Sequence, residues 1–283
     1  MSFFEALILG IVQGLTEFLP ISSSAHLRIV PALLGWEDPG AAFTAVIQIG
    51  TLVAVLAYFW RDIVRIGRAW GEGILTRKPF ENLDARMGWM MIVGTLPIVI
   101  LGILFKDSIE TTIRSLYVVA VALIALSLVL ALAELRVYLR VRAGHPLREL
   151  KDLSWRDAIT TGLAQSMALI PGSSRSGVTI TAGLFAGMSR ETAARFSFLL
   201  SLPSVLAAGL FQLKSNSEAL LGSEQDVAAL IVATLASFVS GYASIAFLLY
   251  YLRTHTTYLF VIYRISLGLL ILHWLNSGSL PAH

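Results

Sequence analysis

The chain has 283 residues, of which 56% are hydrophobic and only 14% are charged, and its formal net charge at pH 7 is +3. A soluble domain carries about a quarter charged residues, so this composition excludes a soluble globular protein and indicates one embedded in a bilayer. The chain contains no cysteine, which excludes disulfides, thiolate catalysis and cysteine-bound metals. The small basic excess does not predict a nucleic-acid partner, because it is explained by where the arginines lie along the chain.

Apolar runs recur along the chain, and each approaches the roughly 20 residues that a helix needs to cross a bilayer. We therefore predict an all-α, polytopic membrane protein that forms a single integral membrane domain over residues 1–283. The predicted spanning helices number about six. They are Ala41–Trp60, Gly88–Phe105, Leu116–Leu135, Phe196–Leu213, Val227–Leu252 and Tyr258–Leu275.

Ahead of the first of these runs, polar residues gather at a predicted helix break. Gln13 and Glu17 are four residues apart, so they share one face of a helix. Pro20 disfavours the continuation of that helix, and Ser22–Ser24 and His26 follow at once. A carboxylate, an imidazole and several hydroxyls are therefore expected to cluster where the helix breaks.

Basic segments predict which loops are cytoplasmic. Arg61–Arg86 and Arg136–Arg156 are rich in arginine and lysine, and the positive-inside rule places both in the cytoplasm. The loops Lys106–Arg114 and Lys214–Asp226 are then outside, and so are both ends of the chain. These assignments of loops to the two sides of the membrane are consistent only if Asp157–Ser189 enters the membrane and returns on the same side.

The turn of that re-entrant segment is the sequence Pro171-Gly-Ser-Ser-Arg-Ser-Gly-Val-Thr179. Its two glycines free the backbone to bend, its four hydroxyls offer donors and acceptors, and Arg175 offers a planar cation suited to phosphate. A charge at bilayer depth costs about 2.5–3.5 kcal/mol on insertion scales, and so indicates a functional site. Phosphate recognition is the use that this residue set favours.

The two polar segments resemble one another. Gly10–Ser24 is similar to Gly162–Ser176, with a glutamine, a proline and a serine run in corresponding positions. Further along, Phe43–Thr51 is similar to Phe196–Ser204. Chance similarity between serine-rich and proline-rich turns is the alternative explanation.

The two copies run in opposite directions across the membrane, which is typical of an inverted-topology repeat. We predict one repeat over about residues 1–135 and the other over about residues 156–275, each with a re-entrant helix pair. Such folds place a site near the midplane, where the broken helices meet.

Each polar residue also has an ordinary explanation when it is taken alone. Glu17 suits an interfacial carboxylate, His26 a packed histidine, Arg175 a snorkelling side chain, and the serines helix caps. Their joint occurrence in both segments favours a site. Together they supply a possible nucleophile, a base, a metal-binding carboxylate and a phosphate clamp.

The segments Gln13-Gly-Leu-Thr-Glu17-Phe-Leu-Pro20-Ile-Ser-Ser23-Ser-Ala-His26 and Pro171–Thr179 resemble the two signature motifs of the undecaprenyl-diphosphate phosphatases, the bacitracin-resistance family. The resemblance covers essentially the whole chain. It implies hydrolysis of undecaprenyl diphosphate to undecaprenyl phosphate, which recycles the lipid carrier of bacterial cell-wall synthesis. It also implies a divalent cation (Mg²⁺, with Ca²⁺ or Mn²⁺ as alternatives) and a multi-pass protein of the bacterial cytoplasmic membrane whose active site opens to the outer face.

The family motif has Glu or Gln at its first acidic position. Because this chain has Gln13 there, Glu17 is expected to carry more of the metal-binding role. Ser23 is the first candidate for the nucleophile, with His26 as its base or as the acid for the leaving group, and direct attack by water is the alternative. The resemblance and the residue chemistry predict catalytic roles for Glu17, Ser23, His26, Ser174, Arg175 and Thr179, substrate binding by Gln13, Gly172, Ser173 and Ser176, and a metal ligand in Glu17.

Two other functions stay open at this point. Inverted repeats with broken helices are typical of transporters, so a polyprenyl-phosphate flippase or secondary transporter is one alternative. A non-catalytic protein that binds a lipid diphosphate is the other, and it needs Arg175 but neither Ser23 nor His26. A homodimer is a further expectation for the membrane-embedded chain.

Overall fold

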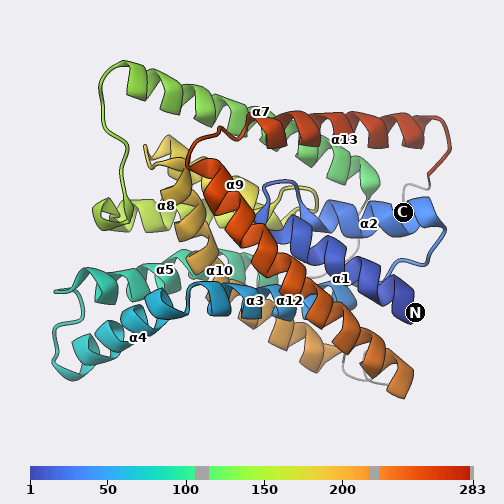
Figure 1. Ribbon diagram of the computed structural model, residues 1–283, viewed down its shortest axis with the longest axis horizontal. Coiled ribbons are helices and arrows are strands. Elements are labelled where there is room, and N and C mark those ends of the chain that lie inside the picture. The colour runs from blue at the N-terminus through green and yellow to red at the C-terminus, as the bar shows by residue number, and fades with distance from the viewer. Residues whose placement is uncertain (106–114, 217–222, 281–283) are drawn as a thin grey trace.

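The computed structural model describes residues 1–105, 115–216 and 223–280, and these ranges are helical throughout apart from short connections (Figure 1). The predicted loop Lys106–Arg114 lies outside them, as does part of the predicted loop Lys214–Asp226. The all-α prediction is confirmed. The α-helices are α1 (Phe3–Phe18), α2 (Ser23–Leu34), α3 (Gly40–Tyr58), α4 (Trp60–Leu75), α5 (Leu83–Leu104), α7 (Leu116–Arg142), α8 (Trp155–Ser166), α9 (Arg175–Phe185), α10 (Arg190–Ser215), α12 (Glu224–Leu252) and α13 (Tyr258–Asn276).

Within the described ranges, five helices are long and apolar enough to cross a membrane, namely α5, α7, α10, α12 and α13. A sixth crossing is counted if α3 and α4, which meet at an angle of 81°, form one broken span. The polytopic membrane protein predicted from the sequence is therefore confirmed, and the predicted span Ala41–Trp60 falls mostly on α3. Helix α4, which carries much of the first basic segment, turns away from that span.

The remaining short helices form two broken pairs. Helix α1 ends at Phe18, just before Pro20, and α2 begins at Ser23 and returns toward the side on which α1 started (Figure 1). Helix α8 gives way to a 3₁₀ turn over Met167–Leu169, and α9 begins only at Arg175. Both breaks fall at the prolines where the sequence predicts them.

The connection between α1 and α2 (the first loop) and the connection between the 3₁₀ turn and α9 (the second loop) have closely similar local geometry. Ser22 and Ser174 have positive φ angles of 75° and 64°, and each side chain accepts a hydrogen bond from a backbone N–H in the first turn of its helix. The loops also interlock, since Ser24 Oγ accepts from Gly172 N at 3.2 Å and Ser176 Oγ donates to Leu19 O at 3.1 Å. This likeness supports the proposed repeat, whose full extent stays a prediction.

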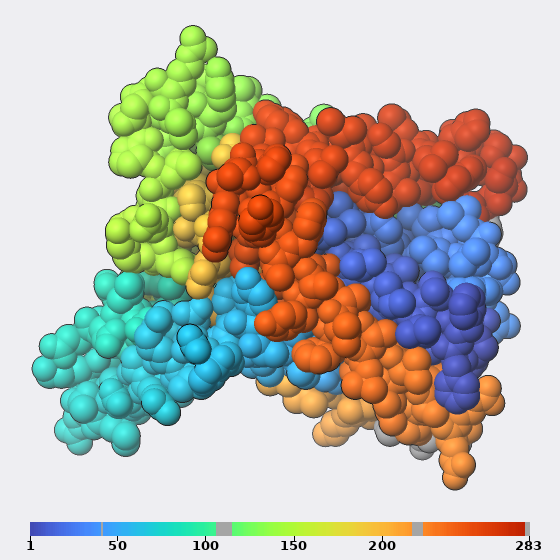
Figure 2. Space-filling view, viewed as in Figure 1, coloured from blue at the N-terminus to red at the C-terminus, as the bar shows by residue number. Residues whose placement is uncertain are grey.

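Helix packing joins the two halves of the chain. Helix α1 packs along α12, α8 packs along α5, and α3 packs against α10. Figure 2 shows the surface of α1 and α2 between the later helices α12 on one side and α13 on the other. Each broken pair is therefore held by spanning helices from the opposite half, which fixes the two loops relative to one another.

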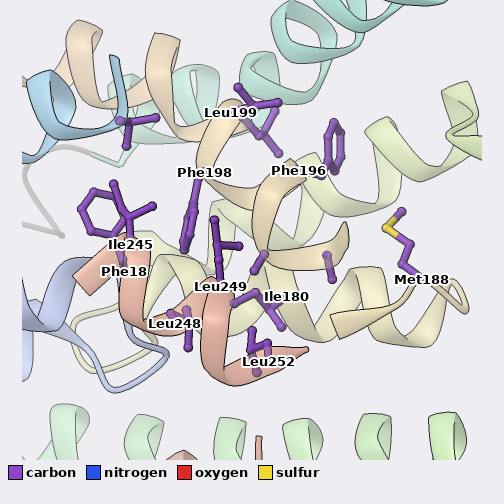
Figure 3. Packing of buried hydrophobic residues seen from close by; sticks show 14 of the residues in the cluster. Phe18, Ile180, Met188, Phe196, Phe198, Leu199, Ile245, Leu248, Leu249 and Leu252 are labelled. Carbon is purple, nitrogen blue, oxygen red and sulfur yellow. The ribbon is translucent and has the colours of Figure 1, made fainter. Parts of the chain in front are cut away.

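An apolar cluster lies beneath the loops. Phe18 of α1 meets Phe198 of α10 edge to face, with ring centroids 5.1 Å apart, and Ile180 and Leu249 pack beside them (Figure 3). In a bilayer, lipid tails already solvate such side chains, so close packing rather than the exclusion of water stabilises the contact. The cluster gives α1, α9 and α10 a rigid common base.

A buried carboxylate ties three helices together at the basic end of the molecule. Glu134 of α7 is 1% exposed, and its oxygens accept from Arg190 Nε and Nη2 at 2.6–2.9 Å. Glu134 Oε1 also accepts from Thr257 N at 2.8 Å, just before α13. One side chain thus positions α7, the start of α10 and the start of α13.

Replacing Glu134 with alanine should lower the free energy of unfolding in detergent by about 3 kcal/mol, because it leaves the Arg190 cation and a buried N–H without their acceptor. Glu81→Ala is the matched control. It breaks the pair between Lys78 and Glu81, whose side chains are 64% and 66% exposed, and it should cost no more than about 1 kcal/mol. Equal losses in the two denaturant titrations would contradict the role assigned to Glu134.

Candidate active site

The Glu17 carboxylate, near the C-terminus of α1, is the point where the two motifs meet. Arg175 Nη2 donates to Glu17 Oε1 at 2.7 Å from a residue 158 positions away. Ser23 Oγ and Gln13 Nε2 donate to Glu17 Oε2 at 2.7 Å and 2.8 Å. The Glu17 side chain is only 4% exposed, so a single buried carboxylate joins the two broken helix pairs.

A cavity of about 190 Å³ opens beside this carboxylate. One part of its wall is polar, and another part, supplied by α5, α10 and the 3₁₀ turn, is apolar. A ligand with a polar head and an apolar tail matches that division. The residues that line the cavity are Glu17, Ser22, Ser23, Ser24, Gln48, Ile98, Ala168, Ser174, Arg175, Ser204, Val205 and Ala208.

Two helix N-termini face the same cavity. Ser23 is the first residue of α2 and Arg175 is the first residue of α9. Each follows a serine whose positive φ lies in a region that residues with a side chain rarely adopt. Because helix N-termini carry unpaired N–H groups and a partial positive charge, the paired arrangement favours an anionic ligand.

Of the predicted catalytic residues, His26 does not reach Ser23. Its Nδ1 lies 2.7 Å from the carbonyl oxygen of Ser22, and its Nε2 lies 2.6 Å from Tyr263 Oη. A nitrogen that faces a carbonyl oxygen must carry the hydrogen, so in the neutral imidazole Nε2 accepts from the tyrosine. The base nearest to Ser23 is Glu17 instead, because the side chain of His26 turns toward α13.

Thr179 also lies away from the cavity. Its hydroxyl, in a residue that is 1% exposed, is 2.7 Å from Arg175 O and 2.6 Å from Ser197 Oγ. These contacts attach α9 to α10. The structure therefore gives Thr179 the geometry of a residue that holds Arg175 in place, whereas the sequence analysis predicted a catalytic role for it.

Ser174, predicted as catalytic, and the three predicted substrate-binding residues of the second loop also differ in position. Ser174 lines the cavity, while the hydroxyls of Ser173 and Ser176 donate to the carbonyl oxygens of Ile170 and Leu19. Gly172 has a φ of 91°, and a Cβ there would lie 2.5 Å from the carbonyl oxygen of Val119. Gly172, Ser173 and Ser176 thus shape the loop and do not line the cavity.

Several residues at or near the site were not predicted as site residues. Gln48 and Ser204 line the cavity, and they lie in the segments Phe43–Thr51 and Phe196–Ser204, which resemble one another. Arg264 contacts the second loop, and its only sequence signal is an arginine within an apolar run. Tyr263 had no signal, because one tyrosine in a membrane helix is unremarkable.

The oxygen donors present suit a divalent cation that takes part of its coordination from substrate. Among the described residues, no group of three or more histidines and carboxylates comes together. However, Gln13 Oε1 is buried without a hydrogen-bond partner there, next to the Glu17 carboxylate. Mg²⁺ is commonly held by one or two protein oxygens together with substrate phosphates and waters, so Glu17 and Gln13 fit this type of site.

Comparison with known proteins gives matches along almost the whole chain. The sequence model of the family described as "Bacitracin resistance protein BacA" matches residues 6–270. The protein of Chlorobium phaeovibrioides named undecaprenyl-diphosphatase is 61% identical over 280 residues, which cover 99% of both chains. Those of Chlorobium limicola and Chloroherpeton thalassium, with the same name, are each 61% identical over 282 residues and all of both chains. The chain therefore belongs to the bacitracin resistance protein BacA family.

Proposed function

We propose that the chain is an undecaprenyl-diphosphate phosphatase of a bacterial membrane. It hydrolyses undecaprenyl diphosphate to undecaprenyl phosphate and inorganic phosphate, and so recycles the lipid carrier of cell-wall synthesis. The observation that carries the proposal is the joining of Ser23, Glu17 and Arg175 on one cavity with a polar and an apolar wall. The name of the relatives, undecaprenyl-diphosphatase, agrees with it.

The diphosphate is proposed to lie between the N-termini of α2 and α9. Arg175 Nη1 is buried and has no hydrogen-bond partner among the described residues. A phosphate oxygen can accept from Nη1 while Nη2 stays on Glu17, so substrate binding completes the fork of this guanidinium. The first part of the prenyl chain would then contact the apolar wall at Ile98, Val205 and Ala208.

Ser23 is placed to attack phosphorus with Glu17 as its base. Its hydroxyl already donates to Glu17 Oε2 at 2.7 Å, within the range for proton transfer. The new Ser23 Oγ–P bond forms as the bond from phosphorus to the bridging oxygen breaks, and undecaprenyl phosphate leaves. The leaving undecaprenyl phosphate takes from Glu17 the proton that came from Ser23, so Glu17 is again a base. Water then gives a proton to Glu17 as its oxygen attacks phosphorus, the bond from phosphorus to Ser23 Oγ breaks, and Ser23 takes the proton back from Glu17 as phosphate leaves. Direct attack by a water held on Glu17 is the alternative.

The other groups assist these steps. Arg175 stabilises the negative charge on the transferred phosphoryl group, and Ser174 caps α9 beside it. His26 is proposed to fix the strained Ser22 peptide through its Nδ1. A divalent cation held by Glu17 and Gln13 would neutralise charge on the diphosphate.

The site is proposed to open to the outer face of the cytoplasmic membrane. Helix α1 begins and α13 ends on the same side of the molecule, opposite the connection from α7 to α8 (Figure 1). That connection belongs to the arginine-rich segment Arg136–Arg156, which the positive-inside rule assigns to the cytoplasm. Assembly as a homodimer stays a prediction.

Purified protein in detergent micelles should release phosphate from undecaprenyl diphosphate, and removal of divalent cations with a chelator should abolish the release. A detergent micelle does not separate two aqueous compartments, so a flippase or transporter gives no signal in this assay. A non-catalytic binding protein leaves the lipid diphosphate unhydrolysed. Activity should return with Mg²⁺, Ca²⁺ or Mn²⁺. Undiminished release after chelation would exclude the proposed cation, and no release with cations present would overturn the function.

Arg175→Lys should lower kcat/KM by about 10²–10³-fold, close to the effect of Arg175→Ala, because the point charge of a lysine does not reproduce the planar fork that binds Glu17 through Nη2 and phosphate through Nη1. The matched control is Arg68→Lys on the exposed part of α4, which should retain normal activity. Near-normal turnover by the Arg175→Lys variant would remove the fork from the mechanism.

Ser23 and Glu17 should behave as one unit in single-turnover kinetics. If Glu17 takes the proton of Ser23, then Ser23→Ala, Glu17→Gln and the double variant should fall to a similar low rate. His26→Ala should add its own, smaller loss to either variant, because it contacts neither of these side chains. Substantial turnover in Ser23→Ala would instead establish direct attack by water.

A further inference from the structure

Arg264 is a fully buried cation in the middle of α13. Its exposed fraction is 0%, and no carboxylate forms an ion pair with it within the described ranges. Its Nη2 donates to the carbonyl oxygens of Ser173 at 2.9 Å and Gly172 at 3.3 Å. Nε and Nη1 have no hydrogen-bond partner among the described residues.

Burying a cation without a counter-ion costs free energy, and the hydrogen-bond acceptors of Arg264 indicate the role that offsets this cost. Both of its acceptors belong to the loop that precedes Arg175. A planar trans peptide carries its C=O and N–H on opposite edges. Because Arg264 binds the Ser173 carbonyl, the N–H of Ser174 is turned away from α13, and Ser174 lines the cavity.

Arg264 also contacts the first turn of α9. A Cβ placed on Gly177 would lie 2.7 Å from Arg264 Nη1, so a glycine at this position lets the guanidinium lie against the helix. The same residue therefore fixes both the loop and the N-terminus that presents Arg175. The net negative charge of a bound diphosphate would offset the charge of Arg264.

We propose that Arg264 is a positioning residue of the phosphatase. It holds the Gly172 and Ser173 carbonyls, so that Ser174 and Arg175 are preorganised for the diphosphate, and it adds a positive charge behind the loop. This inference rests on the proposed function, and it assigns a role to a residue outside both sequence motifs.

The test compares Arg264→Met, which keeps the length of the side chain, with Arg264→Lys, which keeps the charge. Ser266→Ala, an exposed change on the same helix, is the control. For each protein the thermal midpoint, kcat and KM for undecaprenyl diphosphate, and binding of pyrophosphate are measured in detergent. Pyrophosphate serves as a probe of the anion site that needs no turnover.

Arg264→Met should stay folded and lose about 10²-fold in kcat/KM, with weaker binding of pyrophosphate. Arg264→Lys should recover part of both, because an ammonium group can donate to the same two carbonyls, and Ser266→Ala should match the wild type. Normal kcat/KM and pyrophosphate binding in a folded Arg264→Met protein would overturn the proposal. A lower thermal midpoint with normal activity per folded molecule would also overturn it and leave Arg264 a purely structural residue.

If Arg264→Met does not fold, Gly177→Ala provides the second variant, because its methyl group would lie 2.7 Å from Arg264 Nη1 and 3.1 Å from the Ser174 side chain, and so disturbs the contact between Arg264 and the loop without removing the guanidinium. A loss in kcat/KM and in pyrophosphate binding supports the proposal, and unchanged values overturn it. Failure of the proposed function is distinguishable, since the wild type would then release no phosphate. Pyrophosphate binding by the same variants would still decide the role of Arg264.

Discussion

The ion pair between Glu17 and Arg175 is the contact on which the rest of the structure depends. Each residue lies at the end of a broken helix, and each would be costly to bury alone in an apolar environment. The ion pair at 2.7 Å, together with the hydrogen bonds that Ser23 and Gln13 donate to Glu17, offsets the cost of burying the two charges. The same pair connects the two halves of the chain. Arg175 Nη1 and Gln13 Oε1 have no hydrogen-bond partner among the described residues, so both atoms remain available to a ligand.

Broken helices at such depth need every polar backbone group to be satisfied by protein or by a wet cavity. Here the two loops satisfy part of each other's backbone, since Ser24 accepts from Gly172 and Ser176 donates to Leu19. Arg264 of α13 binds the carbonyl oxygens of Gly172 and Ser173. Most of the hydroxyls in the two motifs therefore maintain the loop geometry. Only Ser22, Ser23, Ser24 and Ser174 also line the cavity, which separates the residues that shape the site from those available for chemistry.

The tertiary structure also changes the pairing of side chains that their closeness in the sequence suggested. Ser23 and His26 are neighbours on α2, yet the serine turns to Glu17 of α1 and the histidine to Tyr263 of α13. A side chain bonds to the partner that packing brings near, and α13 arrives from the far end of the chain. Two consecutive residues of α13, Tyr263 and Arg264, thereby contact the first and second broken pairs respectively.

The sequence by itself determined that the protein belongs in a membrane, that its helices break at Pro20 and Pro171, and which two polar motifs form the site. Hydropathy, the effect of proline on a helix and the cost of a buried charge are local properties of the chain, so each can be inferred without the tertiary structure. The resemblance to the family motif, and not the chain alone, implies that a second carboxylate is possible at the position of Gln13. Only the tertiary structure decided that Glu17 is the partner of Ser23, that Thr179 attaches α9 to Ser197, and that Gln48, Ser204 and Arg264 reach the site. Those contacts depend on which helices pack together, and helix packing is set by the shapes of whole surfaces that no local pattern encodes.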